Sequence, residues 1–161
     1  AGRHPLRATT VDLAALAEEC VAEHQGRAFS RRIALATGLC EPGKVRADAA
    51  AIKRIFANLI SNALAYTGEG GRVRLDVRFE EGAGVASLRD SGMGFSESER
   101  KRAGRSFQRF DRAGTVTGAG LGLAIAVELA RRMGGAMRLA SQPSGGSVME
   151  LRLPRAPATA P

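Results

Sequence analysis

The chain has 161 residues, enough for about one domain at roughly 150 residues per domain. Its hydrophobic fraction of 44% and charged fraction of 25% are ordinary for a globular protein, and no uninterrupted apolar run approaches the ~18–20 residues of a membrane helix. The net charge is +8, but the arginines are scattered and there is no Trp to stack on bases, so we expect no nucleic-acid partner.

The two ends of the chain differ in composition from the middle. Residues 1–10 contain no apolar segment of a signal peptide, and we interpret them as a lead-in from a parent chain. Residues 154–161 contain three prolines and offer no apolar face, which predicts a disordered tail. We therefore place a single domain at residues 11–153. Cys20 and Cys40 fit no metal or redox spacing and are typical of a reducing compartment.

Helix and strand patterns alternate through the first part of the domain. Asp12 is placed to cap an amphipathic helix that follows it, and Asp48 to cap a longer helix that runs to about Tyr66. Between these helices, short strands are predicted at Ile33–Ala36 and Lys44–Ala47.

A strand hairpin is predicted next. Arg72–Phe79 alternates charged and apolar residues, which is typical of a half-buried strand. Gly82–Gly84 predicts a turn into a second strand at Val85–Arg89.

An irregular stretch then separates this hairpin from the last elements. No period holds from Asp90 to Gly118, and so long a loop inside a compact domain is usually functional, such as a lid. Beyond it we expect a helix over Leu121–Met133 and closing strands at 137–140 and 148–153. This order predicts an α+β fold, an α/β sandwich with its helices on one face of a mixed sheet.

Four segments carry chemistry, and the first is an asparagine pair. Asn58 and Asn62 lie four residues apart in the long helix, so their amides share one face, with Tyr66 a further turn along. Amide oxygens are hard ligands that suit Mg²⁺. Two solvated asparagines on an amphipathic helix are the alternative.

The second segment is the D-x-G-x-G of Asp90, Gly92 and Gly94, directly after a predicted strand. A carboxylate at a strand end can accept a hydrogen bond from a ligand amino group. The glycines let the backbone approach that ligand closely. A simple β-turn is the alternative.

The third segment lies inside the irregular stretch. Phe107 and Phe110 are placed to anchor a loop to the core, while Arg109 and Arg112 are placed to reach a phosphate. A short amphipathic helix is the alternative.

The fourth segment, with Gly118, Gly120, Leu121 and Gly122, opens the predicted helix. Glycine-rich backbone at a helix N-terminus is an anion site, because unpaired N–H groups meet the positive end of the helix dipole there. The segment lacks both the glycine spacing of a Rossmann fingerprint and the Gly-Lys-Ser/Thr of a P-loop.

In this order, the four segments resemble the N, first glycine, F and second glycine boxes of the catalytic ATP-binding domain of sensor histidine kinases. That domain belongs to the superfamily of gyrase, Hsp90, histidine kinases and MutL. The resemblance covers roughly residues 11–153 and implies a Bergerat-type fold, in which a mixed β-sheet is backed by three helices and a flexible lid covers ATP.

The resemblance also implies roles for individual residues. Asp90 would bind the adenine amino group, Gly92 and Gly94 would shape that pocket, and Tyr66 would stack beside adenine. Asn58 and Asn62 would be the catalytic pair that faces Mg²⁺ and the phosphates. Phe107 and Phe110 would pin the lid. The glycines of the fourth segment would give the lid its hinge and contact the phosphates, namely Gly118, Gly120 and Gly122.

Two positions bear on the activity. The family often has a Lys or Arg that reaches a phosphate where this chain has Ala65. The positive charge would then have to come from Arg54, Arg109 or Arg112. The hydrolytic relatives place a general-base Glu where this chain has Asn58, which favours phosphotransfer to a protein over hydrolysis.

The phosphoacceptor is expected outside this chain. The histidines His4 and His24 are interpreted as ordinary surface residues. His4 is followed by Pro5 and leaves no room for a helical hairpin before Asp12, and no acidic residue directly follows His24. The resemblance then implies a monomeric cytoplasmic fragment that binds ATP and ADP. The partners would be the dimerisation and phosphoacceptor domain of a homodimeric parent kinase and a cognate response regulator. Whether that parent is anchored in the inner membrane stays open.

Two alternatives to a histidine kinase are kept. A nucleotide-binding pseudokinase or regulatory module without transfer is favoured by Ala65. A Ser/Thr-directed kinase of the anti-sigma type is disfavoured by the long lid segment. Transfer to a supplied hairpin domain separates the first alternative from an active kinase.

Overall fold

The computed structural model describes residues 5–92, 119–141 and 145–157 of the chain. The strands in these ranges are β1 (Thr9–Asp12), β2 (Ala34–Cys40), β3 (Lys44–Ala47), β4 (Arg72–Glu80), β5 (Ala83–Asp90), β6 (Ala136–Ser141) and β7 (Ser147–Pro154). The helices are α1 (Leu13–Glu23), α2 (Gln25–Ser30), α3 (Ala49–Tyr66) and α5 (Ala119–Arg132). Across the part of the chain that is described, no helix is both long and apolar enough to span a membrane.

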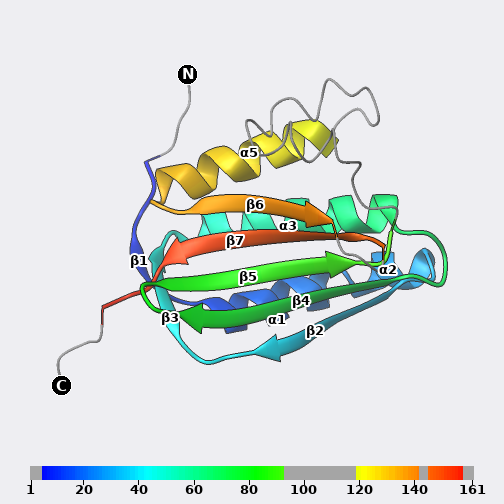
Figure 1. Cartoon of the computed structure of the whole chain (residues 1–161), viewed down its shortest axis with the longest axis horizontal. Coiled ribbons are helices and arrows are strands. Elements are labelled where there is room, and N and C mark those ends of the chain that lie inside the picture. The colour runs from blue at the N-terminus through cyan, green and yellow to red at the C-terminus, as the bar shows by residue number, and fades with distance from the viewer. Residues whose placement is uncertain (1–4, 93–118, 142–144, 158–161) are drawn as a thin grey trace.

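A mixed five-stranded sheet, in the order β2-β4-β5-β7-β6, forms the centre of the domain. β2 runs parallel to β4, and the other neighbours are antiparallel. Strands β1 and β3 form a separate antiparallel pair. In Figure 1, α1 and α3 lie behind the sheet and α5 lies beside β6. The predicted α+β sandwich, with three main helices on one side of a mixed sheet, is confirmed.

The two predicted N-caps start their helices as expected. The Asp12 carboxylate accepts a hydrogen bond from the Ala15 N–H (3.0 Å), and that of Asp48 accepts one from the Ala51 N–H (3.1 Å). The Arg7 N–H also donates to Asp48 (2.8 Å), and this hydrogen bond is the main reason that the pKa of Asp48 is lowered. Each cap satisfies a backbone donor that the first helical turn leaves unpaired, worth about 1 kcal/mol.

The core forms where the apolar stripe of α3 meets the inner face of the sheet. Alternation in β4 buries Val73, Leu75 and Val77 at 1% exposure or less. Facing them, α3 contributes residues at helical spacing that are equally buried, namely Ile52, Ile55, Phe56, Leu59 and Ile60. Both patterns were visible in the sequence, because apolar residues recur with the period of the strand or helix that contains them.

The hairpin between β4 and β5 is tighter than predicted. Glu80 pairs with Ala83, so the loop is Glu81 and Gly82, and Gly82 supplies a positive φ of 77°. Gly84 belongs to the strand rather than the turn. A Cβ on Gly84 would lie 2.5 Å from Val45 Cγ1, so its small size lets β3 pack against β5.

Two elements were absent from the predictions. The short helix α2 was missed because it contains Gly26 and buries only Ala28, which leaves no apolar period to recognise. Strand β1 begins at Thr9, inside the segment that we interpreted as a lead-in, and pairs with β3. At the other end, Arg155 bridges to Val45, one residue beyond β7.

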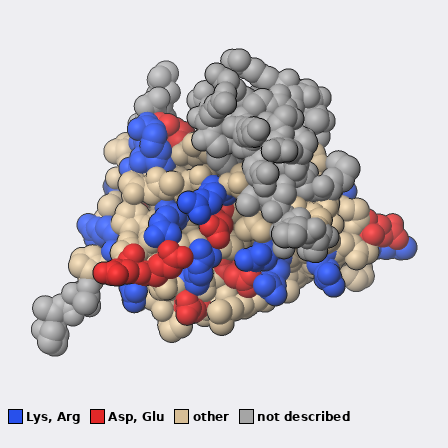
Figure 2. Space-filling model, in the orientation of Figure 1, with Lys and Arg blue, Asp and Glu red and all other residues tan. Residues whose placement is uncertain are grey.

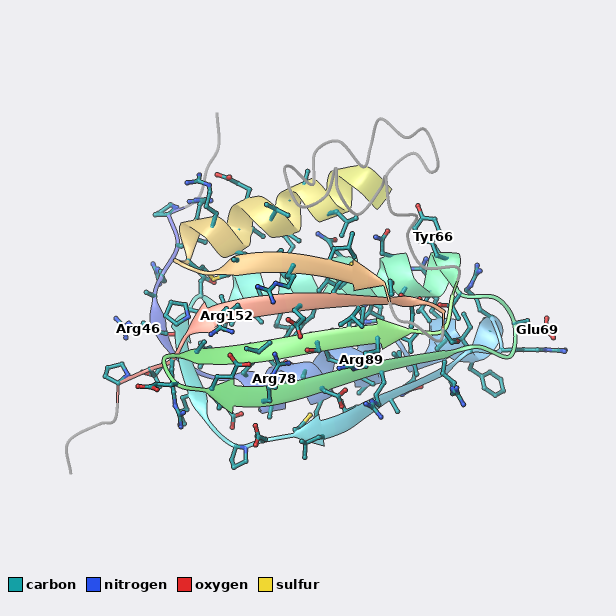
Figure 3. All side chains as sticks on the ribbon, in the orientation of Figure 1. Arg46, Tyr66, Glu69, Arg78, Arg89 and Arg152 are labelled. Carbon is teal, nitrogen blue, oxygen red and sulfur yellow. The ribbon has the colours of Figure 1, made fainter. Side chains whose placement is uncertain are left out.

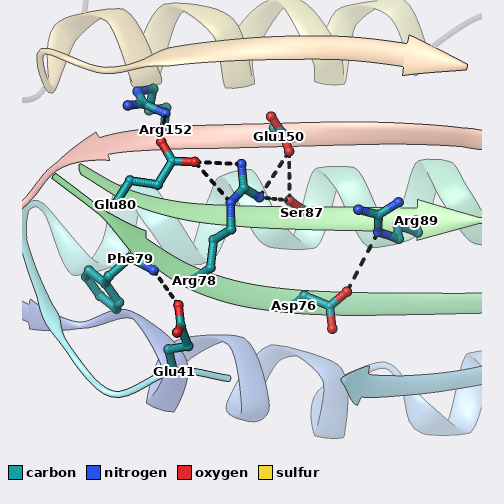
Figure 4. A network of polar contacts seen from close by, with 9 residues as sticks. All are labelled: Glu41, Asp76, Arg78, Phe79, Glu80, Ser87, Arg89, Glu150 and Arg152. Atoms are coloured by element: carbon teal, nitrogen blue, oxygen red, sulfur yellow. Dashed lines mark hydrogen bonds and ion pairs between the residues drawn. The ribbon is translucent and has the colours of Figure 1, made fainter. Parts of the chain in front are cut away.

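The face of the sheet opposite the helices carries charges of both signs. Figure 2 shows Lys and Arg interspersed with Asp and Glu across this face. At its centre, the Arg78 guanidinium donates to Glu80 (3.1 Å), Ser87 (3.0 Å) and Glu150 (3.1 Å), as Figure 4 shows. Arg152 donates to the second Glu80 oxygen (2.6 Å). These partners satisfy one another, which makes this network (Arg78, Glu80, Ser87, Glu150 and Arg152) part of the fold.

Candidate functional site

The candidate site residues gather where four elements end or begin. Figure 1 shows the end of β5, the start of β7, the end of α3 and the start of α5 at the same end of the molecule. Figure 3 places Tyr66 there, at the end of α3. Segments that are far apart in sequence are therefore brought together by the pairing of β5 with β7 and the packing of α3 on α5.

Asp90 is held in a fixed orientation at the end of β5. Its side chain is only 5% exposed. One carboxylate oxygen accepts the Gly92 N–H (2.9 Å), and the other accepts the hydroxyl of Ser147 (2.5 Å). Ser147 stands directly opposite Asp90 in the register of β5 and β7. A buried carboxylate placed this way can accept a further hydrogen bond from the amino group of a ligand.

Ser147 was missed at the sequence level. Its position after Gly145 and Gly146, at the start of a predicted closing strand, was the available signal. Only the strand register shows that it faces Asp90.

Gly146 and Gly92 allow the backbone to pack closely around Asp90. Gly146 has a φ of +87°, and a Cβ there would overlap the Asp90 carbonyl oxygen. A Cβ on Gly92 would lie 2.9 Å from the Tyr66 carbonyl oxygen and 3.0 Å from Asp90 Oδ1. A Cβ at Gly146 would displace the Asp90 backbone, and one at Gly92 would crowd the carboxylate. Close approach therefore requires glycine at both positions, and the positive φ requires it at Gly146 as well.

The α3 side of the site carries the asparagine pair. Asn62 is 7% exposed, whereas Asn58 and Tyr66 are half-buried. Their spacing of four residues places them along one side of α3, as predicted. Across the described residues, no cluster of three or more His, Cys, Asp or Glu side chains could hold a metal ion.

The position of Ala65 is exposed on α3 and so is Arg54. Arg27 of α2 approaches the same helix, since its guanidinium donates to Ser61 Oγ at 3.1 Å. Ser61 lies one helical turn before Ala65. Arg27 was not considered from the sequence, because only the folded chain brings its side chain within hydrogen-bond distance of α3.

Part of the predicted site cannot be compared with the structure. Gly94, Phe107, Arg109, Phe110, Arg112 and Gly118 lie outside the described residues. Gly120, Leu121 and Gly122 fall within the first turns of α5, which begins at Ala119, two residues earlier than predicted.

The histidine and thiol groups in the described ranges do not form a second site. His24 follows α1, and its Nδ1 lies 2.8 Å from the Cys20 carbonyl oxygen. Burial raises the pKa of the Cys20 thiol to about 11 and also raises that of Cys40, so neither is activated as a nucleophile. His4 lies outside the described residues.

Comparison with known proteins gives consistent matches. RssA, a swarming motility regulation sensor protein of Serratia marcescens, is 39% identical over 138 residues, covering 84% of this chain and 29% of RssA. The sensor-like histidine kinase SenX3 of Mycolicibacterium smegmatis is 33% identical over 149 residues, covering 91% of this chain and 39% of SenX3. The chain therefore spans well under half of either relative.

Solved structures agree with these sequence matches. Full-length ShkA in complex with AMPPNP is 29% identical, with a TM-score of 0.81 over 99% of this chain and 34% of that one. The mycobacterial sensor histidine kinase MprB is 25% identical, with a TM-score of 0.79 over 94% of this chain and 100% of that one.

A family model decides the assignment. The model described as "Histidine kinase-, DNA gyrase B-, and HSP90-like ATPase" matches residues 47–157, which is more than half of the chain. The match begins beside the Asp48 cap and includes Asp90, Ser147 and the asparagine pair. The chain therefore belongs to the family of histidine kinase-, DNA gyrase B- and HSP90-like ATPases, as a catalytic ATP-binding domain of the sensor histidine kinase type.

Proposed function

We propose that this domain binds ATP with Mg²⁺ and transfers the γ-phosphoryl group to a histidine on the dimerisation domain of its parent kinase. The observation that carries the proposal is Asp90, a buried carboxylate oriented by Gly92 and Ser147 in a chain of this ATPase family. The similar protein ShkA was solved with AMPPNP, which supports a nucleotide as the ligand.

In this proposal Asp90 selects and orients the base. Its carboxylate accepts a hydrogen bond from the adenine amino group while Gly92 and Ser147 keep it from rotating. Tyr66 packs beside the base at the end of α3. Gly94 would border the same pocket, and the remaining lid contacts would come from Phe107, Arg109, Phe110, Arg112 and Gly118.

The residues present fit a hard divalent cation. Asn58 and Asn62 offer amide oxygens one helical turn apart, and Mg²⁺ prefers such ligands together with phosphate oxygens and water. When bound, Mg²⁺ neutralises charge on the transferred phosphoryl group. The half-buried Asn58 and the buried Asn62 would hold the cation in place. The start of α5, with Gly120, Leu121 and Gly122, would direct backbone N–H groups at the phosphates.

Transfer to a protein is favoured over hydrolysis because Asn58 cannot act as a general base. In-line phosphoryl transfer needs mainly positioning and charge neutralisation, and a separate histidine can serve as the nucleophile. The parent would be a homodimer that passes the phosphoryl group on to a response regulator. We place the catalytic domain at residues 11–153, with strand β1 as its entry from the parent chain.

A second candidate is a nucleotide-binding pseudokinase, which the exposed Ala65 favours because no cation stands at that position. Arg27 weakens this alternative. Its guanidinium is held beside α3 by Ser61 and could reach a phosphate from there.

Phosphotransfer to a supplied partner tests the proposal. The chain is mixed with the dimerisation domain of its parent and radiolabelled Mg-ATP, and the label on histidine is followed over time. We expect transfer by the wild type and none by Asn62→Ala, with the gain in ATP affinity on adding Mg²⁺ also lost in that variant. ATP binding without any transfer would support the pseudokinase. No ATP binding at all would reject both.

A further inference from the structure

Thr67, the residue that follows α3, is buried with an unpartnered hydroxyl. It is 2% exposed, and its Oγ1 has no hydrogen-bond partner among the described residues. Its backbone is fixed, since the Thr67 N–H donates to the Ala63 carbonyl (2.9 Å) and ends the helix. A buried hydroxyl without a partner costs about 1–3 kcal/mol, so such groups are uncommon unless a ligand or water completes them.

The orientation of this hydroxyl is set by Gly71. A Cβ on Gly71 would overlap the Thr67 methyl carbon, so that methyl group lies against the Gly71 α-carbon. With the methyl there, the hydroxyl is directed to the other side, toward Gly92. A Cβ on Gly92 would lie 3.4 Å from Thr67 Oγ1 and 3.0 Å from Asp90 Oδ1. Thr67 Oγ1 and Asp90 Oδ1 therefore border the same spot beside Gly92.

We propose that the Thr67 hydroxyl is a specificity-determining group that hydrogen-bonds the edge of the adenine base, directly or through one water, beside Asp90. This inference rests on the proposed nucleotide site. Thr67 directly follows Tyr66 at the end of the first sequence segment, and the resemblance assigns it no role.

The donor and acceptor pattern explains why adenine fits. Asp90 can only accept, whereas a threonine hydroxyl can also donate. Adenine presents an amino donor beside a ring-nitrogen acceptor, which complements a carboxylate next to a hydroxyl. Guanine presents a carbonyl oxygen beside a ring N–H, and the carbonyl would face the carboxylate. A site built to pair with polar groups rejects a ligand that leaves them unpaired.

The substitution Thr67→Val tests this role because it keeps the shape and the methyl contact with Gly71. Losing one hydrogen bond of ordinary strength should weaken ATP binding about three- to tenfold, whereas weak GTP binding should not change, so discrimination between them narrows. The nucleotide-free variant should melt at the same temperature as the wild type or higher, because it no longer buries an unpaired hydroxyl. Thr67→Ser should keep wild-type discrimination.

Several results would overturn the inference. These are wild-type ATP affinity in Thr67→Val, an equal loss for ATP and GTP, or a clear drop in the melting temperature of the nucleotide-free variant. Asp90→Asn distinguishes this failure from failure of the proposed function. If the wild type does not bind Mg-ATP, or Asp90→Asn binds it as well as the wild type, the nucleotide site itself is wrong whatever Thr67 does.

Discussion

The Arg78 network on the open face of the sheet and the Asp90 end of the same sheet are both polar, but their hydrogen bonds are completed differently. On the open face, Arg78 is surrounded by Glu80, Ser87 and Glu150, and these groups satisfy one another. At the Asp90 end, Thr67 is as buried as Ser87, each residue being 2% exposed, but its hydroxyl has no partner among the described residues.

The difference indicates which polar cluster serves the fold and which serves a ligand. A network whose donors and acceptors are matched stabilises the folded chain and needs nothing else. A buried cluster with an unmatched hydroxyl beside an oriented carboxylate is incomplete until a ligand or water supplies the missing partner. Charge alone would have pointed to the open face, where Lys and Arg lie among Asp and Glu (Figure 2).

The largest expected effect is on ATP affinity. Asp90→Asn should weaken ATP binding by about hundredfold, since an amide replaces an oriented charged acceptor, a change worth roughly 2–3 kcal/mol. The matched control is Asp76→Asn on the open face, where Asp76 accepts from Arg74 (3.0 Å). That variant should bind ATP within about twofold of the wild type, because Asp76 takes no part in the Asp90 cluster. Titration calorimetry measures both, and equal losses would remove the distinction between the two regions.

The next largest effect is the loss of stability when a side chain is added at Gly146, beside Asp90. Gly146→Ala should destabilise the domain by about 2 kcal/mol more than Gly145→Ala, because both positions are strained for alanine but only one is also crowded. Gly145 has a φ of +94° with nothing within 4 Å of a Cβ, whereas a Cβ on Gly146 would overlap the Asp90 carbonyl oxygen. Urea unfolding gives the difference. Equal losses would mean that close approach at Asp90 does not matter.

A smaller effect concerns the acid sensitivity of the open face. Hydrogen bonds from Arg152, and then from Arg78, hold the pKa of Glu80 below its ordinary value of 4.5. The unfolded chain therefore binds the proton more readily. The stability from this group is present above the unfolded pKa and is lost as the pH falls through the lower, folded value.

Glu80→Gln should remove this dependence. Its melting temperature should lie below that of the wild type at pH 7, and the gap should narrow as the pH falls from about 5 to about 3. ATP affinity at pH 7 should not change. A gap that widens in acid would contradict the assignment of Glu80 to the structural network.

The smallest predicted effect belongs to Arg27. If its guanidinium reaches a phosphate from beside Ser61, Arg27→Ala should weaken ATP binding about two- to threefold, as expected of an exposed charge contact. The loss should diminish at high salt. Arg31→Ala, at the end of the same short helix, is the control. If both variants bind ATP like the wild type, the charge missing at Ala65 is supplied elsewhere or not at all.

Local patterns in the sequence were sufficient to predict most helices and strands of the fold. Asp12 and Asp48 mark helix starts because a cap acts on its own neighbours, and the alternation through Val73, Leu75 and Val77 marks a half-buried strand. The helix α2 had no such pattern. The turn at Gly82 was shorter than predicted because Gly84 is required by the packing of Val45, which lies far away in sequence.

The site was predictable only where its residues form motifs. Asp90, Gly92 and the asparagine pair were recognised from spacing. Ser147, Thr67 and Arg27 were not. Their roles arise from strand register, from contact with Gly71 and from a hydrogen bond between two helices, respectively. Contacts between segments that are distant in sequence carry no local signal, so the residues that surround a motif are the hardest to find.

Amide hydrogen exchange with and without Mg-ADP tests the distinction between the two regions most directly. The account predicts that nucleotide slows exchange at the Asp90 end, around Thr67, Gly92 and Ser147, while the amides of Arg78 and Arg152 on the open face exchange at unchanged rates. Slower exchange centred on the open face, or no change at the Asp90 end under conditions where nucleotide is bound, would contradict it.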